Sequence, residues 1–249
     1  MRHLAPLLGG LLACTPLPDP DPEPLPTEED RARAEGIVRD GAGAAVEGAQ
    51  VNLCLVVCRT ELTDEAGAFV HEVPPGTYSF HVVPPAGSGL AEPLVPLTLA
   101  EGDDLVLDVD LPSLEPAVAL PLEAEEIEIA PGVFATTRQG DLTVLFEDDP
   151  TEVAGVRVDE AAWPPLELDG TVLGVWVLSP YEAEADPGMP LRLAETWDLP
   201  EGSTHRLYRS DYWSYGFVEV AELEVEGDWL VDDDARLEVL TTLVLVEGS

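Results

Sequence analysis

The chain has 249 residues, an ordinary apolar content of 45%, and 50 acidic against 11 basic residues, which gives a formal net charge of −39. This length allows one large or two modest domains with a real core. Such an acidic surface repels nucleic-acid phosphates and anionic lipid headgroups, which excludes both as partners.

Residues 1–13 have the layout of a secretory signal peptide: one basic residue, Arg2, then a short apolar run that ends in small residues. The run is too short to span a bilayer. Residues 11–14, Leu-Leu-Ala-Cys, resemble the lipobox of bacterial lipoproteins. This resemblance implies cleavage before Cys14 and lipid on its thiol, where two or more acyl chains anchor firmly. In that family Thr15, in place of Asp, favours the outer membrane. A plain signal peptide with an incidental Cys14 is the alternative.

Residues 14–33 read as the lipidated cysteine followed by a proline-rich, acidic tether. Proline occupies every second position from 16 to 26, with acidic residues between. Each proline fixes its own φ and favours extended angles in the residue before it. The segment is therefore expected to form a polyproline II-like stalk that rises ~3.1 Å per residue. Simple disorder predicts nearly the same behaviour.

The chain has three cysteines, Cys14, Cys54 and Cys58. If Cys14 carries lipid, one pair remains in an oxidising compartment. A straight strand holds residues four apart at ~13 Å, whereas a disulfide needs Cα atoms within ~7 Å. A Cys54–Cys58 disulfide therefore requires a turn at residues 55–57. Two buried thiols are the alternative.

Residues 34–113 are expected to form a first β-sandwich domain, since short strand-like runs recur about every ten residues between Gly and Pro turns. The expected strands are 35–39, 49–55, 57–62, 67–72, 77–83, 93–99 and 104–111.

Three motifs in this region follow one another in a specific order. They are a G-x-V-x-D-x-x-G opening that continues to G-A-x-V, a T-D-x-x-G-x-F turn, and a P-G-x-Y turn. The matching residues are Gly36, Val38, Asp40, Gly43, Val46, Gly48, Ala49, Val51, Thr63, Asp64, Gly67, Phe69, Pro75, Gly76 and Tyr78. In these motifs the region resembles the carboxypeptidase regulatory-like domain, a transthyretin-type β-sandwich. The resemblance implies a fold, and no catalytic site.

Residues 114–249 are expected to form a second all-β domain, so the predicted fold class is all-β with two β-sandwich-like domains. The expected strands are 125–130, 142–146, 153–158, 171–178, 204–209, 216–225 and 236–246. All five Trp lie in this half. The most polar part of the aromatic cluster, Tyr212, Trp213 and Tyr215, is the candidate ligand site, because aromatic rings stack on sugars. For the aromatic residues as a group, packing in the core is the favoured interpretation.

Known catalytic motifs are missing from the sequence. There is no HExxH, no GxSxG and no phosphate-binding glycine loop, so we predict no catalytic residue, no cofactor and no enzymatic activity. His71 and His81 are expected to pair across neighbouring strands without a third ligand, which predicts no metal. Aspartates at 148–149 and 232–234 fit solvated turns better than weak calcium sites.

Together these features predict an extracytoplasmic lipoprotein anchored by Cys14, facing the periplasm or the cell surface. Its expected role is structural, adhesive or binding, with a protein or a glycan as partner. A carbohydrate-binding module that uses the C-terminal aromatics is the alternative. A hydrolase with paired carboxylates is a third hypothesis.

Overall fold

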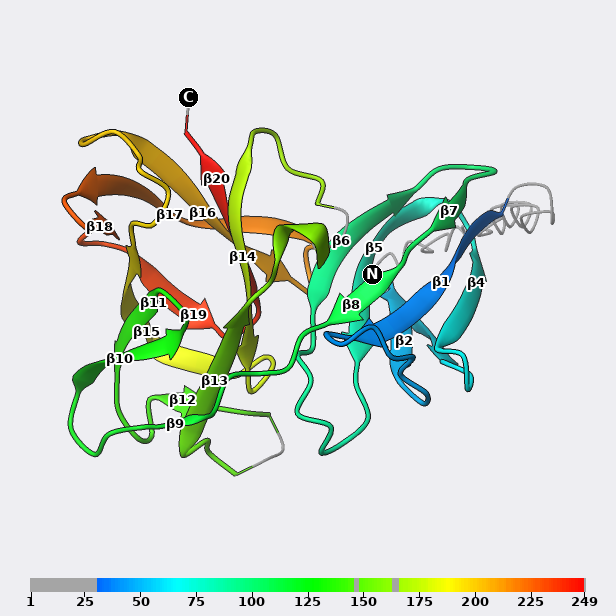
Figure 1. The fold of residues 1–249 in the computed structure, drawn as a ribbon, viewed down its shortest axis with the longest axis horizontal. Helices are drawn as coiled ribbons and strands as arrows, with labels where there is room; N and C mark the ends of the chain where they lie inside the picture. Colours follow the sequence, from blue (N-terminus) through cyan, green and yellow to red (C-terminus); the bar gives the residue numbers. More distant parts are fainter. Residues whose placement is uncertain (1–30, 146–147, 163–165, 249) are drawn as a thin grey trace, which may run out of the picture.

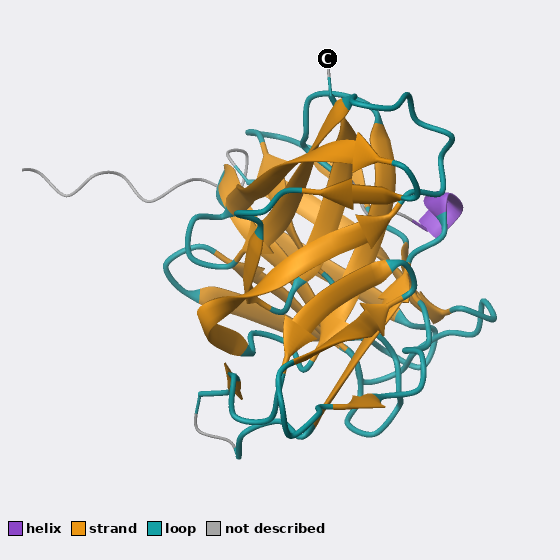
Figure 2. Ribbon diagram, turned by 90° about the vertical axis from the view of Figure 1, so that its left-hand side faces the viewer, coloured by secondary structure: helices purple, strands orange, loops and turns teal. Residues whose placement is uncertain are grey.

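A computed structural model describes residues 31–145, 148–162 and 166–248. These residues form β-strands in three sheets, with one short 3-10 helix at Glu160–Ala162 (Figure 2). The predicted all-β class is therefore confirmed. The described part of the chain contains no helix with the length and apolar character of a membrane span.

Strands β1–β8 form two four-stranded sheets, which we call the N-terminal sandwich (Figure 1). One sheet has the order β4-β1-β7, with β8 also paired to β1, and the other has the order β3-β2-β5-β6. The strands are β1 (Ala32–Asp40), β2 (Gln50–Cys54), β3 (Cys58–Leu62), β4 (Ala68–Val73), β5 (Gly76–Val83), β6 (Leu94–Leu99), β7 (Asp104–Val106) and β8 (Val109–Leu111). Alternate side chains of β1 are buried, as its sequence pattern requires for a strand with one face on a core.

The polar residues of the sequence motifs build the turns of the sandwich. Oδ1 of Asp40 accepts hydrogen bonds from the backbone N–H groups of Ala42 and Ala44, both at 2.9 Å. Asp64 likewise accepts from the N–H groups two and four residues further on. Aspartate is favoured in such turns because its side chain satisfies backbone donors that the turn leaves unpaired.

Strands β9–β20 form one twelve-stranded sheet that is nearly closed, which we call the large sheet. Its main path is β10-β11-β15-β18-β17-β16-β20-β14-β13-β9, with β12 and β19 also paired to β15. The strands are β9 (Val118–Ala119), β10 (Glu125–Ala130), β11 (Val133–Thr137), β12 (Leu142–Thr143), β13 (Glu152–Arg157), β14 (Val172–Ser179), β15 (Glu184–Ala194), β16 (Thr204–Asp211), β17 (Gly216–Glu226), β18 (Trp229–Val231), β19 (Arg236–Val239) and β20 (Thr242–Glu247).

The large sheet nearly closes where β10 returns against β13. A Cβ on Gly155 of β13 would lie 2.5 Å from Cβ of Ala130, so only glycine allows this close approach.

Strand β15 differs from the sequence-based expectation, which left this segment outside the strands. Its residues Pro187, Gly188 and Pro190 are typical of a turn, because proline cannot donate to a ladder. In the structure Pro187 and Gly188 lie within a register shift between Glu184 and Met189, and Pro190 is paired with Arg236. The short strands β9, β11 and β18 were also not predicted, and the expected strand 236–246 is divided into β19 and β20.

The central strands β14 and β20 are buried on both faces. Trp176 and Leu178 of β14 point into the core of the large sheet. Val175 and Val177 point the other way, into an apolar cluster that includes Ala91 of the N-terminal sandwich. This explains why these strands are continuously apolar instead of alternating. The two halves thus share a buried apolar contact.

His71 and His81 do not pair, so that expectation was wrong. His71 lies on β4 and His81 on β5, and these strands belong to different sheets. Nε2 of His71 lies 3.0 Å from the carbonyl oxygen of Val51, and burial lowers the pKa of the imidazole. Nε2 of His81 lies 2.7 Å from a carboxylate oxygen of Glu92.

Gly36 is expected to be essential for the stability of the N-terminal sandwich. A Cβ at this position would lie 1.8 Å from the carbonyl oxygen of Leu107, so the chain must shift. Gly36→Ala should lower the free energy of unfolding by about 3 kcal/mol, measured by urea denaturation. Gly41→Ala is the control, since its Cβ would meet its nearest neighbour at an ordinary 3.7 Å. Equal stability of the two variants would contradict the prediction.

Candidate functional site

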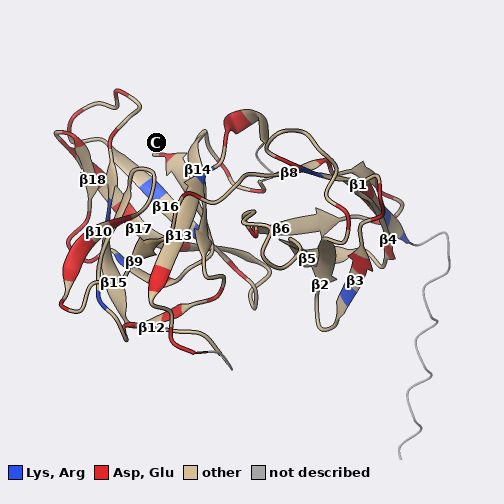
Figure 3. Ribbon diagram, turned by 60° about the horizontal axis from the view of Figure 1, so that its bottom comes forward, with Lys and Arg blue, Asp and Glu red and all other residues tan. Residues whose placement is uncertain are grey.

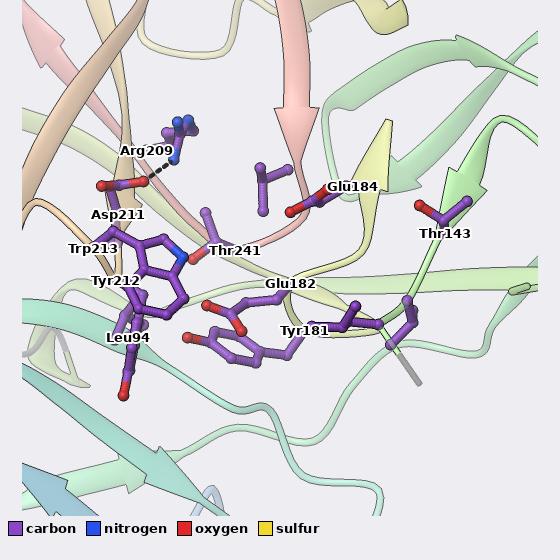
Figure 4. Close-up of a pocket in the computed structure, with 14 residues that line it drawn as sticks. Leu94, Thr143, Tyr181, Glu182, Glu184, Arg209, Asp211, Tyr212, Trp213 and Thr241 are labelled. Carbon is purple, nitrogen blue, oxygen red and sulfur yellow. Dashed lines mark hydrogen bonds and ion pairs between the residues drawn. The ribbon is translucent and has the colours of Figure 1, made fainter. Parts of the chain in front are cut away.

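A cavity of about 500 Å³ lies where the N-terminal sandwich meets the large sheet (Figure 4). Its wall combines aromatic, acidic and hydroxyl side chains from segments that are far apart in the sequence. The lining residues are Leu94, Thr143, Val144, Leu145, Tyr181, Glu182, Glu184, Arg209, Ser210, Asp211, Tyr212, Trp213, Val239 and Thr241. A volume of this size is within the range of small-molecule sites, ~300–1,000 Å³.

The turn at 211–216, which joins β16 to β17, forms one wall of the cavity. Asp211 fixes this turn by accepting hydrogen bonds from the N–H of Ser214 at 2.7 Å and from Nη1 of Arg209 at 2.8 Å. Partial burial alone would raise the pKa of Asp211, but the hydrogen bonds from Ser214 and Arg209 outweigh it and lower the pKa. Asp211 therefore remains ionised and paired at neutral pH.

The same turn is attached to the tip of the β2–β3 hairpin in the N-terminal sandwich. Cys54 and Cys58 are directly opposite in this hairpin and are joined by a disulfide. The Tyr212 hydroxyl lies 2.8 Å from Sγ of Cys58, and it must be the donor because a disulfide sulfur carries no hydrogen. The Tyr215 hydroxyl donates to the carbonyl oxygen of Leu55. The disulfide hairpin therefore supports the wall that carries Tyr212 and Trp213.

A hydrogen bond from strand β5 also holds the 211–216 turn. Oγ of Ser79, on β5, donates to the carbonyl oxygen of Tyr212 at 2.9 Å. In the neighbouring contact between the halves, the N–H of Leu94 donates to Oγ1 of Thr242 at 3.0 Å. The cavity is thus framed by hydrogen bonds that cross from one half of the molecule to the other.

The three aromatic residues predicted as a ligand site have separate positions. Tyr212 and Trp213 line the cavity, whereas Tyr215 does not and instead contacts the hairpin. Trp213 is 79% exposed, and its ring meets Tyr212 edge-on with ring centroids 5.1 Å apart. This arrangement leaves the indole available to a ligand.

Trp176 and Trp197 follow the core-packing interpretation. Trp176 is buried, and its Nε1 donates to the carbonyl oxygen of Pro131 at 2.9 Å. Trp197 is partly buried and donates to the carbonyl oxygen of Leu173 at 2.6 Å. Trp163 lies outside the described residues.

The cavity wall contains three buried hydroxyl groups that were not found from the sequence, those of Ser210, Thr241 and Tyr181. Ser210 and Thr241 are only 2% and 1% exposed, and their hydroxyls have no hydrogen-bond partner among the described residues. A buried polar group without a partner costs about 1–3 kcal/mol. A polar ligand in the cavity can satisfy the hydroxyls of Ser210 and Thr241 only after a small rearrangement of the wall, because less than 1 Å² of either hydroxyl oxygen is accessible. No sequence signal separates them from other Ser and Thr residues.

Tyr181 is a third aromatic residue in the cavity wall. Its ring stacks on His81 of the N-terminal sandwich, with centroids 4.3 Å apart and planes inclined by 25°. Burial raises the pKa of the Tyr181 hydroxyl, and the neighbouring Glu182 carboxylate raises it further. The hydroxyl therefore stays protonated.

The remaining predicted sites contribute no chemistry in the described structure. Cys14 lies outside the described residues. Oδ1 of Asp232 accepts a hydrogen bond from the N–H of Asp234 within its own turn. In the part of the chain that the structure describes, no three His, Cys, Asp or Glu side chains are grouped as metal ligands.

No family model and no curated protein matches this chain. Among solved structures, it is similar to the Bacillus anthracis TIE protein, with 9% identity over 81% of this chain and 42% of that chain, at a TM-score of 0.30. It is also similar to a putative carbohydrate binding protein from Bacteroides uniformis, with 13% identity over 87% of this chain and 79% of that chain, at a TM-score of 0.27. It is similar, too, to the major pilin subunit of Bacillus cereus, with 13% identity over 88% of this chain and 59% of that chain, at a TM-score of 0.28. Such TM-scores carry neither a fold nor a function to this chain.

Removal of the disulfide is expected to loosen the 211–216 turn. The double variant Cys54→Ser/Cys58→Ser should lose about 2 kcal/mol of stability. It should also show faster amide hydrogen exchange at Ser214, whose N–H bonds to Asp211 in the supported turn.

The turn at residues 64–68, on the far side of the sandwich from this contact, is the internal control for the exchange measurement. Its exchange should be unchanged in the double variant. Unchanged exchange at Ser214 would contradict the supporting role of the disulfide, and equal acceleration in both turns would indicate general unfolding instead.

Proposed function

We propose that this protein is an exported, lipid-anchored and non-catalytic binding protein that holds a carbohydrate in the cavity between the N-terminal sandwich and the large sheet. The observation that carries the proposal is the pairing of two unsatisfied buried hydroxyls, on Ser210 and Thr241, with the exposed indole of Trp213 in one wall.

A sugar has an apolar face and polar hydroxyl groups, and both are complementary to the wall of this cavity. Its C–H face is flat and apolar and packs on an aromatic ring. Its hydroxyls both donate and accept hydrogen bonds, as the hydroxyls of Ser210 and Thr241 do. A purely apolar ligand would leave both protein hydroxyls unpaired, at a cost of about 1–3 kcal/mol each. The cavity therefore favours a polyhydroxylated ligand.

The proposed location rests on the start of the sequence. Residues 1–13 are interpreted as a signal peptide, Cys14 as the lipidated residue and residues 14–33 as the tether. The Cys54–Cys58 geometry supports an oxidising compartment. The outer membrane is the proposed site, with Thr15 as the supporting residue.

The proposed domain division is 34–113 and 114–249. The first is assigned to the carboxypeptidase regulatory-like class on its three motifs, and the turns built by Asp40 and Asp64 support this. Within this division the cavity is an interdomain site, because Leu94 belongs to the first domain and all the other lining residues to the second.

Sugar binding is tested by titrating the protein with a glycan panel, followed by intrinsic fluorescence and calorimetry. Trp213→Ala should weaken binding about 5-fold or more, because stacking on an aromatic ring contributes on the order of 1 kcal/mol or more. Leu122→Ala is the control, since Leu122 is 78% exposed but does not line the cavity.

Three results would count against the proposal. Absence of binding to every glycan, or equal affinity of the Trp213→Ala and unmodified proteins, would remove the sugar site. Release of shorter sugars during the titration would instead overturn the non-catalytic assignment and favour the hydrolase hypothesis, with Glu182 and Glu184 as the carboxylates to test.

The lipid anchor has its own test. When the full chain is produced in a Gram-negative host with a fatty-acid analogue, the label should appear on the protein and co-sediment with outer membranes. Cys14→Ala should abolish both labelling and sedimentation. Cys54→Ser/Cys58→Ser should label normally, since only Cys14 follows the lipobox residues. A Cys14→Ala protein that still carries label would refute the site.

A further inference from the structure

We propose that the cavity selects a sugar that carries a free, positively charged amine over neutral and N-acetylated sugars. This inference rests on the proposed sugar-binding function and names the chemical class of its ligand.

The first argument is the imbalance of charge in the cavity wall. Three carboxylates line it, those of Glu182, Glu184 and Asp211, against one guanidinium, that of Arg209. Arg209 is already paired with Asp211, at 2.8 Å. Glu182 and Glu184 form no ion pair among the described residues. Figure 4 shows both side chains at the cavity, with Arg209 next to Asp211.

His81 is the cationic candidate nearest to Glu182, and it is held by other partners. Its Nε2 lies 2.7 Å from Glu92, and its ring is covered by Tyr181. Burial raises the pKa of Glu182, and the charges of Glu92 and Glu184 add to this, which outweighs the lowering by the Tyr181 hydroxyl and by His81. The ionised form of Glu182 is therefore short of positive charge.

The aromatic rings next to these carboxylates suit the same ligand. An ammonium group is attracted by the face of Trp or Tyr, and this attraction adds to that of a carboxylate. Tyr181, Tyr212 and Trp213 line the same cavity as Glu182 and Glu184. An amine bound here would face both kinds of group, whereas the sugar hydroxyls could meet Ser210 and Thr241.

The N-acetylated form of the same sugar has no ammonium group to be attracted by the carboxylates and the ring faces. It carries no charge, so it leaves both carboxylates uncompensated while adding bulk. An acidic sugar would bring a like charge next to two carboxylates and be repelled. Selection among sugars of equal size should thus follow the charge of the substituent.

The experiment compares a glucosamine trimer, its fully N-acetylated form and a glucose trimer by calorimetry at neutral pH. The glucosamine trimer should bind about 10-fold or more tightly than the glucose trimer, and added salt should reduce the difference. In Glu182→Gln/Glu184→Gln most of the preference for the glucosamine trimer over the glucose trimer should be lost.

The whole protein is strongly acidic, so a matched control must remove the same charge elsewhere. Glu222→Gln/Glu224→Gln does so on the exposed face of β17. This variant should keep the preference for the glucosamine trimer. If both double variants lose the preference equally, the effect is a general attraction of the acidic protein for cations, and the inference is overturned. Equal binding of the three trimers would also overturn it, while leaving sugar binding intact. If no trimer and no other glycan binds, the proposed function itself fails.

Discussion

The burial of both faces of β14 and β20 is the constraint on which the rest of the structure depends. Isolated, the large sheet would expose a row of valines, Val175, Val177, Val244 and Val246. Burial of each such side chain contributes on the order of 1.5 kcal/mol or more, so the row strongly favours a covered state. The N-terminal sandwich provides the cover through Ala91 and neighbouring apolar side chains. Because β6 then lies beside β16 and β17, the cavity forms at this junction (Figure 1).

The contact between the two halves also explains how a polar, aromatic turn keeps one conformation at the surface. The 211–216 turn has one exposed ring, Trp213, and two rings used as attachments. Tyr212 and Tyr215 direct their hydroxyls to Cys58 and Leu55 of the disulfide hairpin. Asp211 secures the base of the turn from within. A ring held by its neighbours loses little conformational freedom when a ligand stacks on it, which favours binding.

Much of the fold was readable from the sequence, because period-2 alternation and Gly or Pro turns mark most strands. Strand β1 and the turns at Asp40 and Asp64 are examples. Strand β15 was missed because Pro187 and Pro190 contradict a strand locally, yet Pro187 lies within a register shift of the sheet and Pro190 is paired with Arg236. The pairing of His71 with His81 failed because sequence proximity does not reveal which strands share a sheet.

The cavity itself could be predicted only in part. Tyr212 and Trp213 were recognisable as a polar aromatic turn, but Ser210 and Thr241 become distinctive only once burial removes their partners. Glu182 and Glu184 are two among 50 acidic residues, so composition gives them no special meaning. Their role depends on which carboxylates lack a cation after the fold has assembled.

Because basic residues are scarce in this protein, the carboxylates of Glu182 and Glu184 indicate the charge of the ligand. Acidic residues cover both halves of the molecule, and only 11 basic residues are available to offset them (Figure 3). The arginines are used in the framework: Arg192 pairs with Glu126, and Arg157 lies over the rings of Trp176 and Trp197. Exposed carboxylates tolerate this shortage because water solvates them. Glu182 and Glu184 are also exposed, but they line a cavity with aromatic neighbours, where a cationic ligand meets two carboxylates and the face of a ring at once.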